Sequence, residues 1–249
     1  MQNPPWKRLI EGPIPSNVMR FAKQTGKAIN TYSMIGEGET VLLSASGGKD
    51  SLALALALSL RRRWLPIDYT LKAVLINWLE HPIAQEGLEL LEEYFTALGY
   101  ELTIYHERQN PDSFNGDFNC YLCSRNRRRI IFEHCRKEGI ELVAMGHHLD
   151  DLVETTLMNL CFRASFSTML PVQPFFDGKV TVIRPMIEVR EKNIASLAKQ
   201  LELPVIKPVC PYDQSNIRSR LKPIVSSLSH LDPLTRQHIY NSHHFEGRV

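Results

Sequence analysis

A short loop of glycine and serine carries the residues best suited to chemistry. Residues 46–51 read Ser-Gly-Gly-Lys-Asp-Ser and join the apolar, β-branched run 40–44 to the Leu- and Ala-rich run 51–63. These two runs predict a buried strand and a helix, so the loop precedes a helix N-terminus. Gly47 and Gly48 lack Cβ atoms, which lets the backbone approach a phosphate closely, and the helix dipole favours negative charge there. The glycine loop therefore predicts a phosphate site.

The polar side chains of this loop suit a nucleotide. Ser46 and Ser51 can add hydroxyl donors, and Lys49 adds a positive charge. Asp50 would repel a bare anion, but a magnesium ion can bridge a carboxylate and phosphates. The aspartate thus indicates Mg²⁺ beside the phosphates. A glycine turn that merely joins a strand to a helix is the alternative.

Residue spacing excludes two other nucleotide motifs. A Walker A loop has a glycine five residues before its last glycine and a Ser or Thr after its lysine, whereas this chain has Leu43 and Asp50 at those positions. A dinucleotide fingerprint needs its glycines after the strand, but Gly36 and Gly38 precede it.

A second polar motif follows another expected strand. Residues 146–151 read Gly-His-His-Leu-Asp-Asp, after the apolar run 141–145 and before the helical run 151–163. Because the carboxyl ends of parallel strands meet at one edge, we expect this motif to face the ligand of the glycine loop. Adjacent histidines do not share a helical face, which argues against zinc. Helix capping by Asp150 or Asp151 is an alternative that can coexist with function.

Two of the five cysteines have the spacing of metal ligands. Cys120 and Cys123 stand at the start of an expected helix, where their spacing brings both sulfur atoms to one side. The pair suits an iron–sulfur cluster or zinc, and core thiols or half of a redox motif are the alternatives. Cys135 and Cys161 fall among apolar residues of expected helices, which predicts buried thiols that are not ligands.

In order along the chain, these features resemble the tRNA 2-thiocytidine synthetase family of PP-loop ATP pyrophosphatases. The resemblance covers about residues 26–218 and includes Ile-Arg-Pro at 183–185 and a late cysteine. Two segments depart from the family pattern. Cys210 is followed by Pro-Tyr-Asp-Gln instead of closely by Gly-Ser-Gln, and residues 163–174 lack the glycine- and lysine-rich character of that region in the family.

The resemblance implies a set of site residues. Lys49, Asp50 and Asp151 are implied to act in catalysis, together with Mg²⁺. The residues implied to bind ATP are Ser46, Gly47, Gly48, Lys49, Asp50, Ser51, Gly146, His147 and Asp150. The residues implied to hold a [4Fe-4S] cluster, with one iron open to a sulfur species, are Cys120, Cys123 and Cys210.

An arginine run follows the cysteine pair. Arg125, Arg127, Arg128 and Arg129 spread around the expected helix, so they cannot all be buried. Cations near the site suit an RNA backbone, and these four arginines predict the RNA-binding surface. The net charge of +2 is too small to indicate nucleic acid by itself.

Apolar runs that alternate with helical runs determine the expected fold class. They predict an α/β fold, a parallel twisted sheet with helices on both faces. The resemblance implies that this sheet is of the adenine nucleotide alpha-hydrolase-like type. With 249 residues, 43% of them hydrophobic, the chain can bury one compact core. Residues 1–35 predict a packing arm with an irregular, proline-containing start. Residues 36–205 predict the PP-loop domain, and 206–249 a C-terminal extension that carries the late cysteine.

Together these features favour ATP-dependent, cluster-dependent tRNA thiolation, which forms 2-thiocytidine through an adenylated base. The expected partners are tRNA, a sulfur donor such as a cysteine desulfurase, and a second copy in a homodimer. A cluster-dependent desulfidase or sulfur transferase acting on a free base or other small molecule is one alternative. A nucleotide-binding zinc regulator without sulfur chemistry is another. No apolar run suits a membrane span or signal core, so we expect a cytoplasmic protein without membrane contact.

Overall fold

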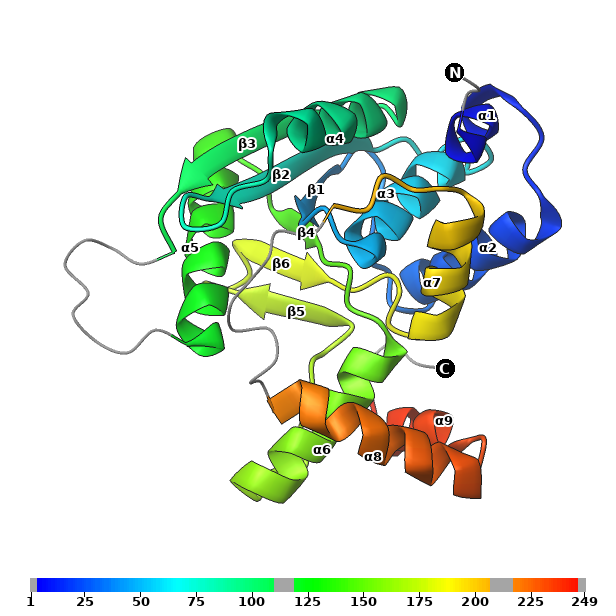
Figure 1. Cartoon of the computed structure of the whole chain (residues 1–249), viewed down its shortest axis with the longest axis vertical. Helices are drawn as coiled ribbons and strands as arrows, with labels where there is room; N and C mark the ends of the chain where they lie inside the picture. Colours follow the sequence, from blue (N-terminus) through cyan, green and yellow to red (C-terminus); the bar gives the residue numbers. More distant parts are fainter. Residues whose placement is uncertain (1–3, 110–118, 207–216, 246–249) are drawn as a thin grey trace.

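The computed structural model describes residues 4–109, 119–206 and 217–245, which form one six-stranded sheet and its helices (Figure 1). The strands are β1 (Thr40–Ala45), β2 (Thr70–Trp78), β3 (Glu101–Glu107), β4 (Leu142–Ala144), β5 (Val172–Phe175) and β6 (Val180–Ile183). Their order is β3-β2-β1-β4-β6-β5, and all neighbouring pairs are parallel except β5 with β6. The α/β fold with its parallel sheet is confirmed.

The antiparallel edge strand β5 was not expected. Its four residues include Pro174, which lacks an N–H group for pairing and is tolerated at a sheet edge. A tight turn leads from β5 into β6, and in it Phe176 and Asp177 have φ values of 54° and 57°. Because β5 is short and partly exposed, neither its length nor an alternation of apolar residues marks it as a strand.

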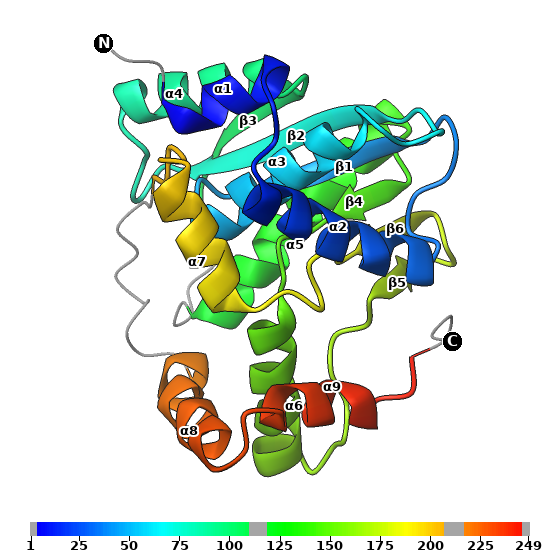
Figure 2. The same cartoon turned by 90° about the vertical axis from the view of Figure 1, so that its right-hand side faces the viewer.

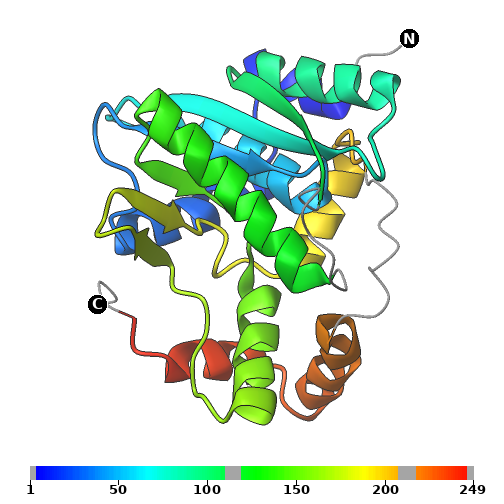
Figure 3. The ribbon, with the colours of Figure 1, turned by 90° about the vertical axis from the view of Figure 1, so that its left-hand side faces the viewer.

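The strand order determines which helices cover each face. The helices α3 (Lys49–Arg61) and α4 (Gln85–Ala97) connect β1 to β2 and β2 to β3, in one direction along the sheet. The helix α5 (Cys120–Glu138) leads from β3 back past β1 to β4, so a right-handed crossover carries it to the opposite face. Figure 3 shows α5 lying across that face.

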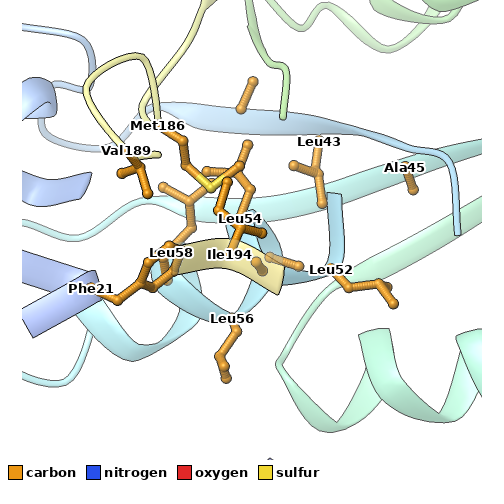
Figure 4. Close-up of a cluster of buried hydrophobic side chains, with 14 of the residues drawn as sticks. Phe21, Leu43, Ala45, Leu52, Leu54, Leu56, Leu58, Met186, Val189 and Ile194 are labelled. Atoms are coloured by element: carbon orange, nitrogen blue, oxygen red, sulfur yellow. The ribbon is translucent and has the colours of Figure 1, made fainter. Parts of the chain in front are cut away.

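The main core lies between the sheet and α3. Alternate residues of β1 point to opposite faces, so Leu43 packs toward α3 while Leu42 belongs to the smaller cluster under α5. In α3, residues 51–58 are all buried, because α2 (Ser16–Thr31) and α7 (Glu191–Gln200) cover its outer side. Figure 4 shows Leu54 and Leu58 within this cluster.

The N-terminal segment is more regular than expected. Residues that the prolines marked as irregular form α1 (Pro5–Glu11), with Pro5 in the first turn, where the missing N–H group costs little. Trp6 is buried and packs edge-on against Tyr94 of α4, with ring centroids 4.8 Å apart. The packing arm is therefore helical from its first described residues.

Three helices pack together beyond one end of the sheet, as Figures 1 and 2 show. They are α6 (Leu149–Arg163), α8 (Ile217–Leu231) and α9 (Thr235–Ser242). The helices α8 and α9 were not anticipated, since Pro223 interrupts the helical pattern and polar residues dominate α9. In the part of the chain that the structure describes, no helix is both long and apolar enough to cross a membrane.

The buried α3 face predicts a large stability effect. Leu54 is completely buried, so Leu54→Ala should lower the free energy of unfolding by about 2–5 kcal/mol through lost burial and a residual cavity. Leu79→Ala is the matched control, because this leucine is 52% exposed and should change stability little. Urea denaturation measures both values, and equal effects would contradict the assignment of the core.

Candidate active site

The carboxyl ends of β1 and β4 meet where the sheet changes direction. The chain runs from β1 to β2 and β3 on one side, whereas β6 and β5 follow β4 on the other side. Open α/β sheets bind ligands at such a switch point. The glycine loop follows β1 and the second motif follows β4, so both lie at this position.

Gly146 packs the second motif against the glycine loop. A Cβ atom on Gly146 would lie 3.1 Å from the carbonyl carbon of Asp50 and 3.1 Å from the amide nitrogen of Ser51. A larger side chain would therefore force the two backbones apart. The two motifs are direct neighbours, although about a hundred residues separate them in the sequence.

The serines hold the glycine loop in an open turn. Ser51 Oγ accepts a hydrogen bond from the Ser46 amide (3.2 Å) and donates one to the Gly48 carbonyl (3.0 Å). Gly47 has a φ of 71°, which favours glycine, and its carbonyl accepts from the Ile206 amide (2.9 Å). The N-cap of α3 is Gly48, which supplies no capping side chain. This helix start suits an anion.

Two lysines and two carboxylates surround the loop. Lys49 Nζ lies 3.0 Å from Asp50 Oδ2 and 3.0 Å from Glu191 Oε1, and Lys222 Nζ of α8 lies 3.1 Å from Glu191 Oε2. Burial acts to raise the pKa of Glu191, but the hydrogen bonds and charges of the two lysines lower it to about 2. Burial acts to lower the pKa of Lys49, yet Asp50 and Glu191 raise it above its ordinary value. Both groups are therefore charged at neutral pH.

Asp50 also presents an oxygen suited to a cation. Its Oδ1 is buried and accepts no hydrogen bond within the described structure, and His148 Nε2 lies 3.8 Å away. A buried carboxylate oxygen without a donor costs free energy, which a hard cation would offset. The chemistry of this oxygen fits Mg²⁺.

Asp151 is engaged at the start of α6. Its Oδ2 accepts from the His148 amide (3.0 Å), and His148 Nδ1 accepts from the Asp151 amide (3.3 Å), which is a capping box. Capping is thus present, but the suggestion that Asp150 or Asp151 is the N-cap is wrong. The helix starts at Leu149, earlier than expected, which makes His148 the cap.

Asp150 connects three helices around the site. It is buried, its Oδ2 accepts from the Glu191 amide at the start of α7 (2.7 Å), and its Oδ1 accepts from Arg236 Nε of α9 (2.6 Å). Arg236 also contacts Ser229 of α8. The carboxylate of Asp150 therefore determines where Glu191 lies relative to the glycine loop.

His147 lies beside the arginine of the Ile-Arg-Pro segment. Arg184 Nε donates to His147 Nδ1 (3.3 Å), while the rest of the guanidinium donates to the Leu170 carbonyl and to Gln173 Oε1 of β5. Burial lowers the pKa of Arg184 to about 10, and the charge of Arg128 adds to that effect. Arg184 thus links the second motif to the edge strand.

Cys120 and Cys123 lie in the first turn of α5, which Asn119 caps through its side-chain oxygen. Cys120 is exposed, and Cys123 is partly buried, with Gln109 Nε2 3.5 Å from its sulfur atom. Cys210 lies outside the described residues. Within those residues, no three His, Cys, Asp or Glu side chains gather as a metal site. The three-cysteine cluster therefore stays a prediction.

The remaining two cysteines differ from each other. Cys135 is buried as expected, and burial raises the pKa of its thiol to about 12. The expectation that Cys161 is buried is wrong, because this thiol is exposed. It lies near the end of α6, which extends beyond the sheet and leaves its last turns uncovered.

The four predicted RNA-binding arginines have different surroundings. Arg125 is exposed, Arg128 is partly buried, and the Arg127 guanidinium carbon lies 5.8 Å from the centre of the Trp78 ring. Arg129 forms an ion pair with a glutamate one turn along α5, at 2.8 Å. They spread around the helix as expected, and one of them already has an anionic partner.

A groove with a volume of about 1020 Å³ lies beside α5, between this helix and the β5–β6 turn. Arg125 and Arg128 contribute to its lining, together with Phe132 of the same helix and Phe176 and Lys179 of the β5–β6 turn. Phe176 is 59% exposed, and its ring centroid lies 5.4 Å from that of Phe132. A basic groove with aromatic side chains suits single-stranded RNA. The sequence did not indicate that Phe176 and Lys179 of the β5–β6 turn would line this groove.

Glu191 and Lys222 are further site residues that sequence reasoning missed. Glu191 is the first residue of α7, and its backbone amide donates to Asp150, which fixes that helix end beside the loop. Lys222 belongs to a helix that was not expected. No local motif marks either residue.

Comparison with known proteins identifies the family. A PP-loop domain family matches residues 18–226. A tRNA-cytidine(32) 2-sulfurtransferase from Cupriavidus necator is 34% identical over 208 residues, 81% of this chain and 64% of that protein. One from Syntrophotalea carbinolica is 36% identical over 217 residues, 84% of this chain and 82% of that protein. The chain thus spans less than two thirds of the first relative and over four fifths of the second.

Solved structures agree on the fold. The U34-tRNA thiolase NcsA from Methanococcus maripaludis, solved with its [4Fe-4S] cluster, matches 91% of this chain and 77% of that chain with a TM-score of 0.74 and 24% identity. An NH3-dependent NAD synthetase from Campylobacter jejuni matches 90% of this chain and 92% of that chain with a TM-score of 0.51 and 19% identity. With its two motifs in contact at the switch point, the chain belongs to the PP-loop family and, within it, to the family of tRNA-cytidine(32) 2-sulfurtransferases.

Proposed function

We propose that this chain is an ATP-dependent tRNA sulfurtransferase that converts a cytidine to 2-thiocytidine. The observation that carries the proposal is the contact of Gly146 with the backbone of Asp50 and Ser51, which joins the two motifs into one charged site. The names of the curated relatives, at 34% and 36% identity, support the same activity.

In the first half of the reaction, the C2 oxygen of cytidine attacks the α-phosphorus of ATP and pyrophosphate leaves. This step adenylates the base and divides a difficult substitution into two easier ones. Lys49 and the amide groups of the glycine loop stabilise negative charge on the phosphates, with hydroxyl groups from Ser46 and Ser51. Gly146, His147 and Asp150 form the opposite wall of the ATP site.

Mg²⁺ would be held by the carboxylates of the site. Asp50 offers its Oδ1, which accepts no hydrogen bond in the described structure, and Asp151 is the second candidate ligand or orienting group. When bound, the ion neutralises charge on the phosphates.

In the second half, sulfur replaces the adenylated oxygen at C2, and AMP leaves. Cys120, Cys123 and Cys210 would hold a [4Fe-4S] cluster, which when bound supplies an iron with an open position for a sulfur species. The cysteine pair suits such a group, since it stands in one helical turn with one sulfur exposed and the other beside an amide donor. A sulfur donor such as a cysteine desulfurase would provide the sulfur as a persulfide, and a thiol reductant would supply the two electrons that bring it to the sulfide level at which it attacks C2.

The acceptor RNA would lie along α5. Arg125, Arg127, Arg128 and Arg129 are the proposed phosphate contacts, beside the aromatic groove. We further propose that the protein is a cytoplasmic homodimer. In each subunit, residues 36–205 would be the catalytic domain, flanked by the arm 1–35 and the extension 206–249.

The first test removes the carboxylate of the glycine loop. Asp50→Ala should lower pyrophosphate release by about 100-fold or more, because the phosphates lose their metal ligand. Iron content should not change, which separates this variant from a folding defect. Asp68→Ala is a control at an exposed aspartate. Unchanged pyrophosphate release would contradict the assignment of the ATP site.

The second test removes one proposed cluster ligand. Cys123→Ala should lose most of its iron and sulfide after anaerobic purification while it retains ATP binding, because Cys123 lies on α5 and belongs to neither the glycine loop nor the second motif. Cys161→Ala, at an exposed cysteine, is the control and should keep its iron. A colourless wild-type protein that contains zinc would favour the zinc regulator instead.

The third test measures RNA binding. Arg125→Ala should weaken tRNA binding and reduce the slope of log affinity against log salt by about one, the change expected for one lost phosphate contact. Arg20→Ala changes an exposed arginine of α2 and should leave the slope unchanged. A weak, flat salt response of the wild type would favour a free base or another small molecule as the acceptor.

A further inference from the structure

The carboxylate of Glu191 lies between two lysines in a site built for anions. Lys49 comes from the start of α3, Glu191 from the start of α7 and Lys222 from α8. The side chains of Lys49 and Glu191 are 22% and 29% exposed, and that of Lys222 is 50% exposed. Three elements that are distant in sequence thus bring alternating charges to the glycine loop.

The backbone at Glu191 has an anchor apart from the two lysines. Its backbone amide donates to Asp150 Oδ2 at 2.7 Å, and Arg236 holds the other oxygen of that aspartate at 2.6 Å. The helix start that carries Glu191 is therefore anchored through buried groups. Each lysine, by contrast, reaches Glu191 through a flexible four-carbon side chain.

We propose that Lys222 is a second cation of the polyphosphate site, and that Glu191 is an internal counter-anion which holds both lysines until phosphate displaces it. The inference rests on the proposed ATP function and extends it to a residue of the C-terminal helices. Both lysines end in flexible side chains, so their ammonium groups are free to exchange the carboxylate for another anion within their reach.

Electrostatics support this exchange. The carboxylate of Glu191 offsets part of the charge of the two ammonium groups, and Asp50 also pairs with Lys49, so the lysines can stay charged while partly buried. Burial acts to lower the pKa of Lys222, but its hydrogen bond with Glu191 and the charges of Glu191 and Glu154 raise it. Lys222 is thus a cation at neutral pH, and a polyphosphate with several negative charges would compete with one carboxylate for it.

A purely structural role predicts different behaviour. If the pair of Glu191 and Lys222 only attached α8 to α7, loss of either partner would lower thermal stability and would not affect ligands. If Glu191 competes with phosphate, loss of the carboxylate and loss of the ammonium group must have opposite effects on phosphate affinity. The sign of each change therefore separates the two roles.

The experiment measures binding of Mg²⁺–ATP and of Mg²⁺–pyrophosphate to the full chain by titration calorimetry. Lys222→Met should weaken both ligands about tenfold, the effect of one charge-assisted hydrogen bond. Lys222→Arg should restore most of the affinity. Glu191→Gln, which keeps the shape of the side chain, should tighten both ligands about threefold or more by removing the competing charge. Lys199→Met, at an exposed lysine of α7, is the control and should leave affinity unchanged.

The outcomes distinguish this inference from the proposed function. If the wild-type protein binds both ligands and Lys222→Met binds them with the same affinity, the counter-anion role is overturned and the ATP site stays in place. Weaker binding of the ligands by Glu191→Gln would have the same meaning. A wild-type protein that binds neither ligand would overturn both. Thermal denaturation of every variant shows whether an affinity change reflects the site or a loss of folded protein.

Discussion

The contact between Gly146 and the backbone at Asp50 and Ser51 is the constraint on which the site depends. It requires β1 and β4 to be neighbours, and that pairing follows from the crossover of α5 over the sheet. Without this strand order, the loop and the second motif would lie at different points along the edge. The fold therefore places the glycine loop and the second motif next to each other, and the sequences of these two segments supply the chemical groups.

A second property of the site is that its charged groups are nearly all engaged with one another. Asp150 holds a helix start, Asp151 completes the capping box of α6 whose N-cap is His148, and Glu191 pairs with two lysines. The Oδ1 atom of Asp50, which accepts no hydrogen bond, stands out against this background. Residues that we propose to bind ATP or to act in catalysis can thus also support the framework, so a loss of activity in a variant needs a stability measurement beside it.

Patterns of neighbouring residues in the sequence predicted those strands, helices and turns that short-range interactions determine. The buried strands β1 and β2, the helix α3 and the glycine loop follow from apolar runs and turn residues that are visible in the sequence. The edge strand β5 is short and half-exposed, and α9 is largely polar, so neither has a strong periodic pattern. Glu191 reaches the site through Asp150, a long-range contact that no spacing rule predicts. The exposure of Cys161 likewise depends on how far α6 extends past the sheet.

The hydrogen bond between the Ile206 amide and the Gly47 carbonyl has a mechanical consequence. Ile206 is the last described residue before the segment that carries Cys210, and α8, which follows that segment, bonds back to the same site through Lys222. The two described stretches on either side of residues 207–216 are therefore both bonded at the glycine-loop site. A displacement of the glycine loop would disturb the end of the stretch 119–206 and the helix α8 at the same time.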